Sequence, residues 1–273
     1  MEIRSVLVNV DLDLANASAL KYAIDLARTF DAQLVGVAAD QPNLKSAGMD
    51  QGGTAIEFYA MERAEVEVRL AAAETRFHEL VLDGAKSAWR GFVANPVSAL
   101  LDTAGVADII VTSAHTGAVF QSPQKVNLGD LVLRAGRPVI DVADGVTEFK
   151  TDTIMVGWKD TREARRAVAD ALPFLQRAKD VLALTVSEGD ARAERDSLKD
   201  LLTWLSGHGV KVRDELIDNR EGFDDVLQTT AILNKADMLV TGGYGHSRAR
   251  EWLFGGVTRN LLNANRLTRL LSN

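Results

Sequence analysis

The chain repeats one plan of strands and helices in its two halves, and this repeat limits the folds that it can adopt. Short apolar runs at Val6–Asp11 and Ile154–Lys159 each end in polar residues. Further along, Ala107–Thr112 and Ala236–Thr241 form a second matched pair of apolar runs. Apolar runs that alternate with segments of helical periodicity are typical of a parallel sheet covered by helices. The sequence therefore predicts two α/β domains in tandem.

Each leading strand is followed by a segment in which apolar residues recur at helical spacing. These segments are Ala17–Phe30 and Arg162–Gln176. They lead to a second pair of apolar runs, Gln33–Ala38 and Val181–Val186. Both halves are thus expected to begin with a strand, a helix and a second strand.

The boundary between the halves is predicted at Ala143–Asp152, a polar segment that contains glycine. We therefore expect one domain over residues 1–145 and a second over residues 151–273. The first half is the longer, and we assign its excess to a loop around Asp40–Gly53 and to a long helix from about Thr54 to Leu82. Because the linking segment is short, the two halves are expected to pack as neighbours.

Composition argues against several classes of function. A net charge of −7 and a pI near 5.2 argue against a general binder of nucleic acid or of anionic membranes. No apolar run is long enough to span a bilayer, and the absence of cysteine excludes disulfides. The first residues hold no apolar signal region, so the expected location is the cytoplasm.

Two glycine clusters in the second half have the pattern of a phosphate-binding loop. Thr241-Gly242-Gly243-Tyr244-Gly245 follows a matched strand, and Gly255-Gly256-Val257-Thr258 begins ten residues after Gly245. Glycine lets main-chain N–H groups approach an anion closely. The apolar segment Val257–Leu262 is expected to form a helix whose N-terminus faces the same anion. Both clusters are therefore predicted to bind one phosphate chain.

With this element, Gly-x-x-Gly followed after nine residues by Gly, the chain resembles a tandem member of the universal stress protein family. Gly242, Gly245 and Gly255 match the three family glycines, and the run Gly129–Pro138 resembles the end of the first domain in tandem members. The resemblance implies two Rossmann-like domains, similar to adenine nucleotide alpha hydrolases. Each would be a five-stranded parallel sheet of order 3-2-1-4-5, with ATP or another adenine nucleotide beside strands 1 and 4.

The resemblance assigns the nucleotide, with Mg²⁺ as an optional accompanying ion, to the second domain. The residues expected to contact it are Gly157, Trp158, Lys159, Val186, Thr241, Gly242, Tyr244, Gly245, Gly255, Gly256, Val257 and Thr258. Two roles stay open for Trp158, namely stacking on the base and packing in the core. The histidines have no ligand spacing that would predict a metal site. Asp11 and Asp13 are close enough to suggest a metal or acid pair, but we expect them to form a loop that precedes a helix.

Several positions depart from the family pattern. Gly256 replaces a family Ser or Thr, so phosphate binding is expected to be weakened rather than abolished. Lys159 stands where the family tends to have Asp, which the first half retains as Asp11. The first half lacks the phosphate loop and is expected to be a degenerate, structural copy. Its last strand contains Pro138-Val139-Ile140, whereas the second half has Arg266–Leu270 at the strand that often pairs subunits in the family.

The sequence contains neither a nucleophile elbow nor a P-loop with its lysine. We therefore expect a regulatory protein of the stress response that binds an adenine nucleotide, with at most weak ATP hydrolysis. The halves are expected to pair within one chain, in imitation of a homodimer, and two such chains can pair again. The alternative is a docking protein built from paired stress-protein domains that binds no nucleotide.

Overall fold

The computed structural model describes residues 2–12, 17–43, 55–81, 86–113, 125–187, 191–218, 226–243 and 267–273. Strands of the first half are β1 (Ser5–Asn9), β2 (Gln33–Asp40), β3 (Ser87–Val93), β4 (Ile109–Thr112) and β5 (Val139–Asp141). Strands of the second half are β6 (Thr153–Gly157), β7 (Asp180–Ser187), β8 (Val212–Asp218), β9 (Met238–Gly242) and β10 (Arg269–Ser272).

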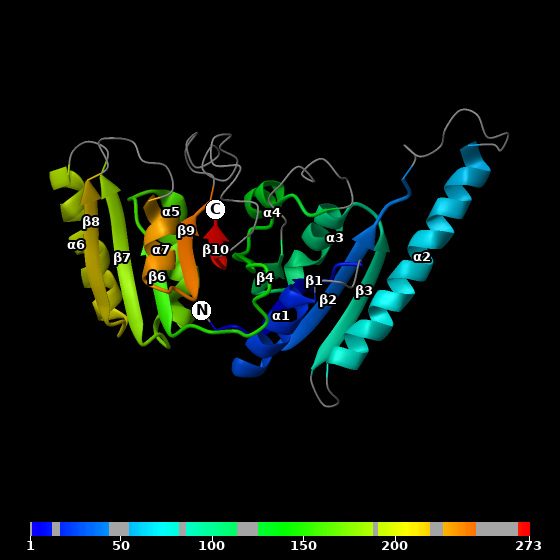
Figure 1. Ribbon diagram of the computed structural model, residues 1–273, viewed down its shortest axis with the longest axis horizontal. Coiled ribbons are helices and arrows are strands. Elements are labelled where there is room, and N and C mark those ends of the chain that lie inside the picture. Colours follow the sequence, from blue (N-terminus) through cyan, green and yellow to red (C-terminus); the bar gives the residue numbers. More distant parts are fainter. Residues whose placement is uncertain are drawn as a thin grey trace.

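The described strands form one sheet in the order β3-β2-β1-β4-β5-β10-β9-β6-β7-β8. Within each half the strands are parallel and follow the order 3-2-1-4-5, which confirms the predicted fold class. The halves meet where β5 pairs with β10 in the antiparallel direction, with Ile140 opposite Leu270. Figure 1 shows the two halves side by side with β10 near the middle.

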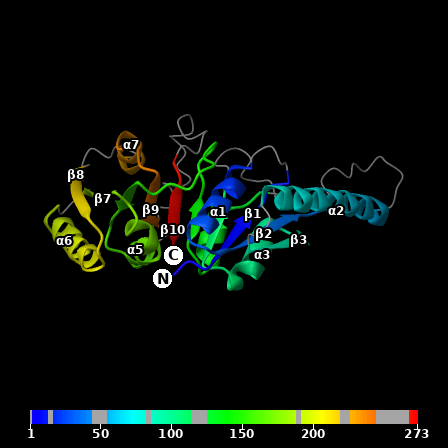
Figure 2. The same cartoon turned by 90° about the horizontal axis from the view of Figure 1, so that it is seen from below.

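Helices connect the parallel strands and cover both faces of the sheet. They are α1 (Ser18–Thr29), α2 (Ala55–Leu80), α3 (Pro96–Thr103), the short 3-10 helix η2 (Ala104–Val106), α4 (Leu128–Arg134), α5 (Arg162–Leu175), α6 (Ala191–Gly207) and α7 (Val226–Leu233). In Figure 2, α1 and α2 lie on one side of the first-half strands and α3 lies on the other. None of the described helices has both the length and the apolar character needed to cross a bilayer.

Local sequence explains where several helices begin. The Asn95 side chain accepts hydrogen bonds from the N–H groups of Val97 and Ser98, and Pro96 occupies the first turn of α3. The Thr161 hydroxyl accepts from the N–H of Ala164 at 3.2 Å at the start of α5. Both caps satisfy backbone donors that a helix N-terminus would otherwise leave unpaired.

The strands β2 and β7 are longer than the sequence predicted. β2 continues to Asp40, which pairs with Val93, and β7 continues to Ser187, which pairs with Asp218. Both polar residues are buried. A buried polar side chain at a strand end resembles a loop residue in sequence, so the prediction ended these strands too early.

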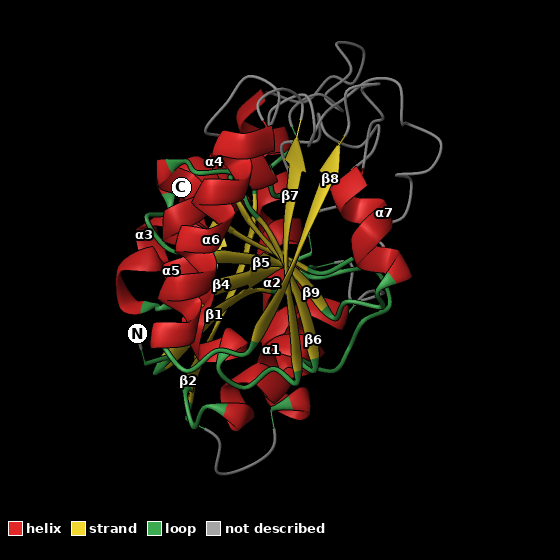
Figure 3. Ribbon diagram, turned by 90° about the vertical axis from the view of Figure 1, so that its left-hand side faces the viewer, coloured by secondary structure: helices red, strands yellow, loops and turns green. Residues whose placement is uncertain are grey.

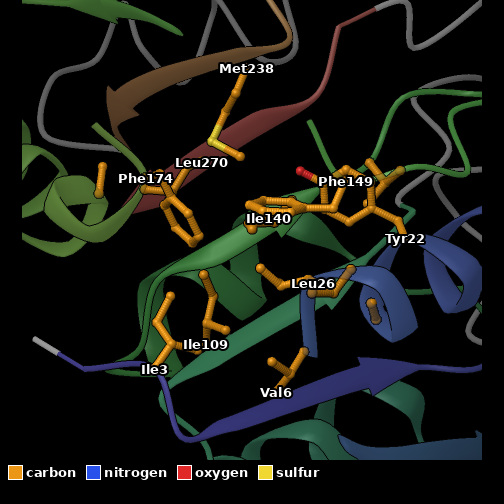
Figure 4. Packing of buried hydrophobic residues seen from close by; sticks show 14 of the residues in the cluster. Ile3, Val6, Tyr22, Leu26, Ile109, Ile140, Phe149, Phe174, Met238 and Leu270 are labelled. Carbon is orange, nitrogen blue, oxygen red and sulfur yellow. The ribbon is translucent and has the colours of Figure 1, made fainter. Parts of the chain in front are cut away.

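One hydrophobic cluster runs through both halves on the face covered by α1, α2, α5 and α6. Figure 4 shows Val6, Leu26 and Ile109 of the first half in the same core as Phe174, Met238 and Leu270 of the second. The opposite face has two separate clusters, under α3 and α4 in the first half and under α7 in the second. Each strand is rotated relative to its neighbour, as Figure 3 shows, which is the usual twist of a large sheet.

The segment that links the halves is itself part of the core. Phe149 packs edge-to-face against Tyr22 and lies 5.7 Å, between ring centroids, from Phe174. Its backbone N–H donates a 2.9 Å hydrogen bond to the Asp25 carboxylate of α1. The linker therefore contributes packing between α1 and α5 in addition to joining two strands.

Candidate functional site

The candidate site lies at the carboxyl ends of β6 and β9 in the second half. From β6 the sheet continues to β7 on one side and to β9 on the other, so the chain connections leave β6 in opposite directions. Ligands of open α/β sheets bind at such a topological switch point. Gly157 ends β6 and Gly242 ends β9, so the structure brings two of the predicted site residues to this edge.

The glycines at this edge are required by close packing. A Cβ atom on Gly242 would lie 2.5 Å from the backbone nitrogen of Ala164 in α5. A Cβ atom on Gly157 would lie 2.9 Å from Cγ2 of Thr241. Real Cβ atoms do not approach backbone this closely, so α5 and β9 can adopt their observed separation because position 242 has no side chain. These two glycines have a structural role that needs no ligand.

Gly243 joins the site to the first half of the molecule. A Cβ atom there would lie 2.7 Å from Cγ1 of Val132 in α4, and the Gly243 N–H donates a 2.7 Å hydrogen bond to the carbonyl of Ser272. Gly243 therefore lies close to the junction between the two halves.

Trp158 follows β6 with its side chain turned into the core. The side chain is 7% exposed, and its indole N–H donates a 3.0 Å hydrogen bond to the Ser197 hydroxyl in α6. The indole is thus held on the α6 side of the sheet by packing and by this bond. Of the two roles left open for this residue, the geometry favours core packing for the side chain.

The remaining predicted residues in the described part of the chain differ in exposure. Lys159 is exposed, and its carbonyl accepts a 2.7 Å hydrogen bond from the N–H of Thr161. Val186 is partly buried near the end of β7, and Thr241 is buried in β9. Lys159 is therefore the most exposed of these three residues at the strand ends.

Side chains of the protein itself already bond to the backbone N–H groups at the N-terminus of α5, beside Gly242. The Glu163 carboxylate accepts a hydrogen bond from its own backbone N–H, and this bond, with help from Thr161 and Arg162, lowers the pKa of Glu163. Thr161 caps the N–H of Ala164. These two side chains already use donors of the first turn, so this helix end offers little to a bound phosphate.

Sequence reasoning missed a group of polar side chains on the α6 side of β7. Thr185 and Ser187 are 3% and 0% exposed, and neither hydroxyl oxygen has a hydrogen-bond partner among the described residues. The Glu194 Oε2 atom of α6 is buried and unpaired in the same way. Hydroxyls at the polar end of an otherwise apolar strand were the signal that could have identified this group.

The other predicted site residues are Tyr244, Gly245, Gly255, Gly256, Val257 and Thr258, and they lie outside the described residues. The same holds for the helix expected at Val257–Leu262. Within the part of the chain that is described, no three His, Cys, Asp or Glu side chains are grouped so as to hold a metal ion.

Solved structures with the same fold cover nearly all of this chain. A universal stress protein from Archaeoglobus fulgidus DSM 4304 matches 98% of this chain and 96% of its own, with 14% identity and a TM-score of 0.70. A functionally unknown protein from Pseudomonas aeruginosa PAO1 matches 99% of this chain and 92% of its own, with 16% identity and a TM-score of 0.56.

A third match comes from a different kind of protein. The cytoplasmic domain of a prokaryotic cation chloride cotransporter matches 98% of this chain and 95% of its own, with 12% identity and a TM-score of 0.50. No protein-family model and no curated protein matches the chain. At these identities the likeness is one of fold. Each half of this chain has the predicted strand order 3-2-1-4-5. The chain therefore has the fold of a tandem universal stress protein.

Proposed function

We propose that the chain is a regulatory protein of the stress response whose second half binds ATP or another adenine nucleotide. The nucleotide lies at the carboxyl ends of β6 and β9, with its phosphates on the glycine clusters around Gly245 and Gly255. The predicted contacts of the β6 end, Gly157, Trp158 and Lys159, belong to the same proposal, with Trp158 contributing its backbone because its side chain packs in the core. Mg²⁺ accompanies the phosphates where their charge requires a counter-ion.

The observation that supports this proposal most is the position of the glycine motif in the fold. β9 ends with Gly242 at the switch point, and in the sequence this residue begins the Gly-x-x-Gly motif that ends with Gly245. The hydroxyls of Thr185 and Ser187 at the end of β7 have no partner among the described residues. They also fit a polar ligand or water at this edge, because buried polar groups need hydrogen-bond partners.

The proposed role is binding rather than robust catalysis, with at most weak ATP hydrolysis. A ligand that binds the folded chain stabilises it by mass action and shifts its conformational populations. A bound nucleotide can therefore change the surface that the protein presents to a partner without being consumed. We place this action in the cytoplasm, where ATP is abundant.

Native mass spectrometry and calorimetric titration with ATP and AMP test the proposal. We expect about one adenine nucleotide per chain. Gly245→Asp and Gly255→Asp should each weaken ATP binding at least about tenfold, because a carboxylate repels the phosphates. The matched control is Gly105→Asp, which adds the same charge in η2, where a Cβ atom meets nothing within 4 Å. Unchanged affinity in both glycine variants would show that the nucleotide site is elsewhere.

A second candidate function is a docking protein that binds no nucleotide. The packing of Gly157, Gly242 and Gly243 favours it, because the fold alone accounts for these three glycines. Absence of bound nucleotide mass and of binding heat up to millimolar ATP would support this candidate.

The domain limits 1–145 and 151–273 and the pairing of two chains remain part of the proposal. Light scattering of the purified chain distinguishes a monomer from a homodimer. A dimer would have to form through surfaces other than β5 and β10, since these strands already pair within the chain.

A further inference from the structure

The first half contains a cavity at its own switch point. Described residues at the ends of β1, β2 and β4 and at the start of α3 enclose about 80 Å³ there. One water molecule needs roughly 10–15 Å³ of such space, so the cavity has room for a small molecule of several heavy atoms. Its lining includes four charged side chains, Asp11, Asp40, Arg69 and Lys125, together with Ser113.

The four charges in the cavity are arranged as two ion pairs. Arg69 Nη1 lies 2.7 Å from Asp40 Oδ2, and Lys125 Nζ lies 3.2 Å from Asp11 Oδ2. The other oxygen of Asp40 accepts a hydrogen bond from the N–H of Gln41. Because the positive and negative charges of the described lining residues cancel, these residues provide no excess positive charge to offset a triphosphate or another multiply charged anion.

The polar atoms left over in this cavity are able to donate hydrogen bonds. Arg69 Nε and Ser113 Oγ are both buried, and neither has a hydrogen-bond partner among the described residues. The Nε–H of arginine lies on a different edge of the guanidinium plane from Nη1, so the bond to Asp40 leaves it available. Buried donors that have no acceptor among the described residues are suited to an oxygen-bearing ligand in the cavity.

The equivalent positions in the second half have different chemistry. Leu34 pairs with Val6 as Val181 pairs with Ile154, so Asp40, six residues after Leu34, corresponds to Ser187. The buried residues Leu70, Ala73 and Phe77 of α2 have the spacing of Leu198, Leu201 and Leu205 of α6. Arg69 therefore corresponds to Ser197. The ion pair of the first half is replaced by two serines in the second, so the two switch points offer different chemical groups.

We propose that the cavity of the first half is a binding site for a small monocarboxylic acid. One carboxylate oxygen accepts from Arg69 Nε and the other from the Ser113 hydroxyl. The cavity can take a single negative charge more readily than several, because guanidinium binds carboxylate strongly and the two aspartates oppose any further negative charge. This site is independent of nucleotide binding in the second half.

Saturation-transfer NMR and calorimetric titration with sodium acetate and sodium lactate test the site on the full chain. Sodium phosphate and sodium chloride, matched in ionic strength, serve as competing probes. We expect saturable binding of at least one of the two carboxylates and weaker binding of phosphate. ATP should not compete with the carboxylate. Phosphate binding as tight as the carboxylates, or no saturable carboxylate binding up to tens of millimolar, would overturn the proposal.

Two variants identify the donors, with a matched serine control. Ser113→Ala removes one hydroxyl and should weaken carboxylate binding about tenfold, the usual effect of one hydrogen bond to a charged group. Arg69→Lys keeps a cation beside Asp40 but removes the Nε–H, and it should weaken binding by at least as much. Ser98→Ala, at an exposed position of α3, should leave affinity unchanged. Wild-type affinity in both Ser113→Ala and Arg69→Lys would show that the carboxylate binds elsewhere.

Discussion

Glycine at position 242 is compatible with two different roles, a contact with phosphate and close packing against a helix. The motif predicts a contact with phosphate, whereas the structure leaves no room for a Cβ atom there, which would meet the backbone of Glu163 and Ala164 in the first turn of α5. Both requirements favour glycine at the same position. A substitution there tests the packing role directly, because stability can be measured without any ligand.

Gly242→Ala should lower the free energy of unfolding by about 1–3 kcal/mol, because the new methyl group must displace backbone of α5. Urea denaturation without nucleotide measures this loss. Gly207→Ala is the matched control, since a Cβ atom at position 207 in α6 meets nothing within 4 Å. There alanine should be neutral or stabilising by up to about 1 kcal/mol, owing to its higher helix propensity. Equal stability of the two variants would contradict the packing role of Gly242.

At the scale of elements, the pairing of β7 with β8 includes a charged contact between neighbouring strands. Arg213 of β8 donates through Nε and Nη2 to both carboxylate oxygens of Asp180 in β7, at 3.0 to 3.2 Å. These hydrogen bonds lower the pKa of Asp180, with the opposite charge of Arg213 adding to the effect. Folded and unfolded chains therefore bind protons differently in acid.

We expect the stabilisation from this pair to be fully present above the pKa of an unfolded aspartate, about 3.9. It is then lost as the pH falls through the lower pKa of the folded state. Since both side chains are more than 40% exposed, the effect should be at most about 1 kcal/mol. Asp180→Asn should therefore cost stability at pH 6 and converge with the wild type near pH 2, as urea titrations would show. Asp214→Asn, at an exposed neighbouring position of β8, is the matched control, and a loss of stability at pH 6 as large as that of Asp180→Asn would contradict the role of the pair.

In the whole molecule, the antiparallel pairing of β5 with β10 joins the strands of the two halves into one sheet. Arg269 lies opposite Asp141 in this antiparallel pair, and Nη2 contacts the buried carboxylate at 2.6 Å. Thr268 adds a hydrogen bond from the N–H of Ala143 to its hydroxyl. Two side chains from the second half thus bind the end of the first half.

Asp141→Ala should cost about 3–5 kcal/mol, because it leaves the Arg269 guanidinium nearly buried without its partner. Combining Asp141→Leu with Arg269→Met should recover most of that loss, since an apolar pair of similar volume avoids the cost of desolvating two charges. Chemical denaturation monitored by fluorescence measures both effects. Asp130→Asn, which removes an exposed pair with Arg134, should change stability by less than about 1 kcal/mol. A cost at Asp141 no larger than at Asp130 would contradict the role assigned to the junction.

The sequence by itself determined the repeated plan of strands and helices, because local periodicity is readable over short windows of sequence. The order of strands in each half was implied by the family resemblance that the glycine motif carries. The limits of β2 and β7 were predicted less well, because Asp40 and Ser187 are polar yet remain in the sheet. Part of the predicted nucleotide site, including Gly245 and Gly255, lies outside the described residues and remains a prediction.

Only the tertiary structure decided how the halves join and what their switch points contain. The pairing of β5 with β10 unites residues that are far apart in the chain, and no local pattern encodes such a contact. The ion pair of Asp40 with Arg69 likewise depends on how α2 lies across β2. Long-range packing also turned Trp158 into the core and made Gly242 necessary for α5. Each of these contacts depends on which surfaces meet after folding, and that information is spread over the whole chain.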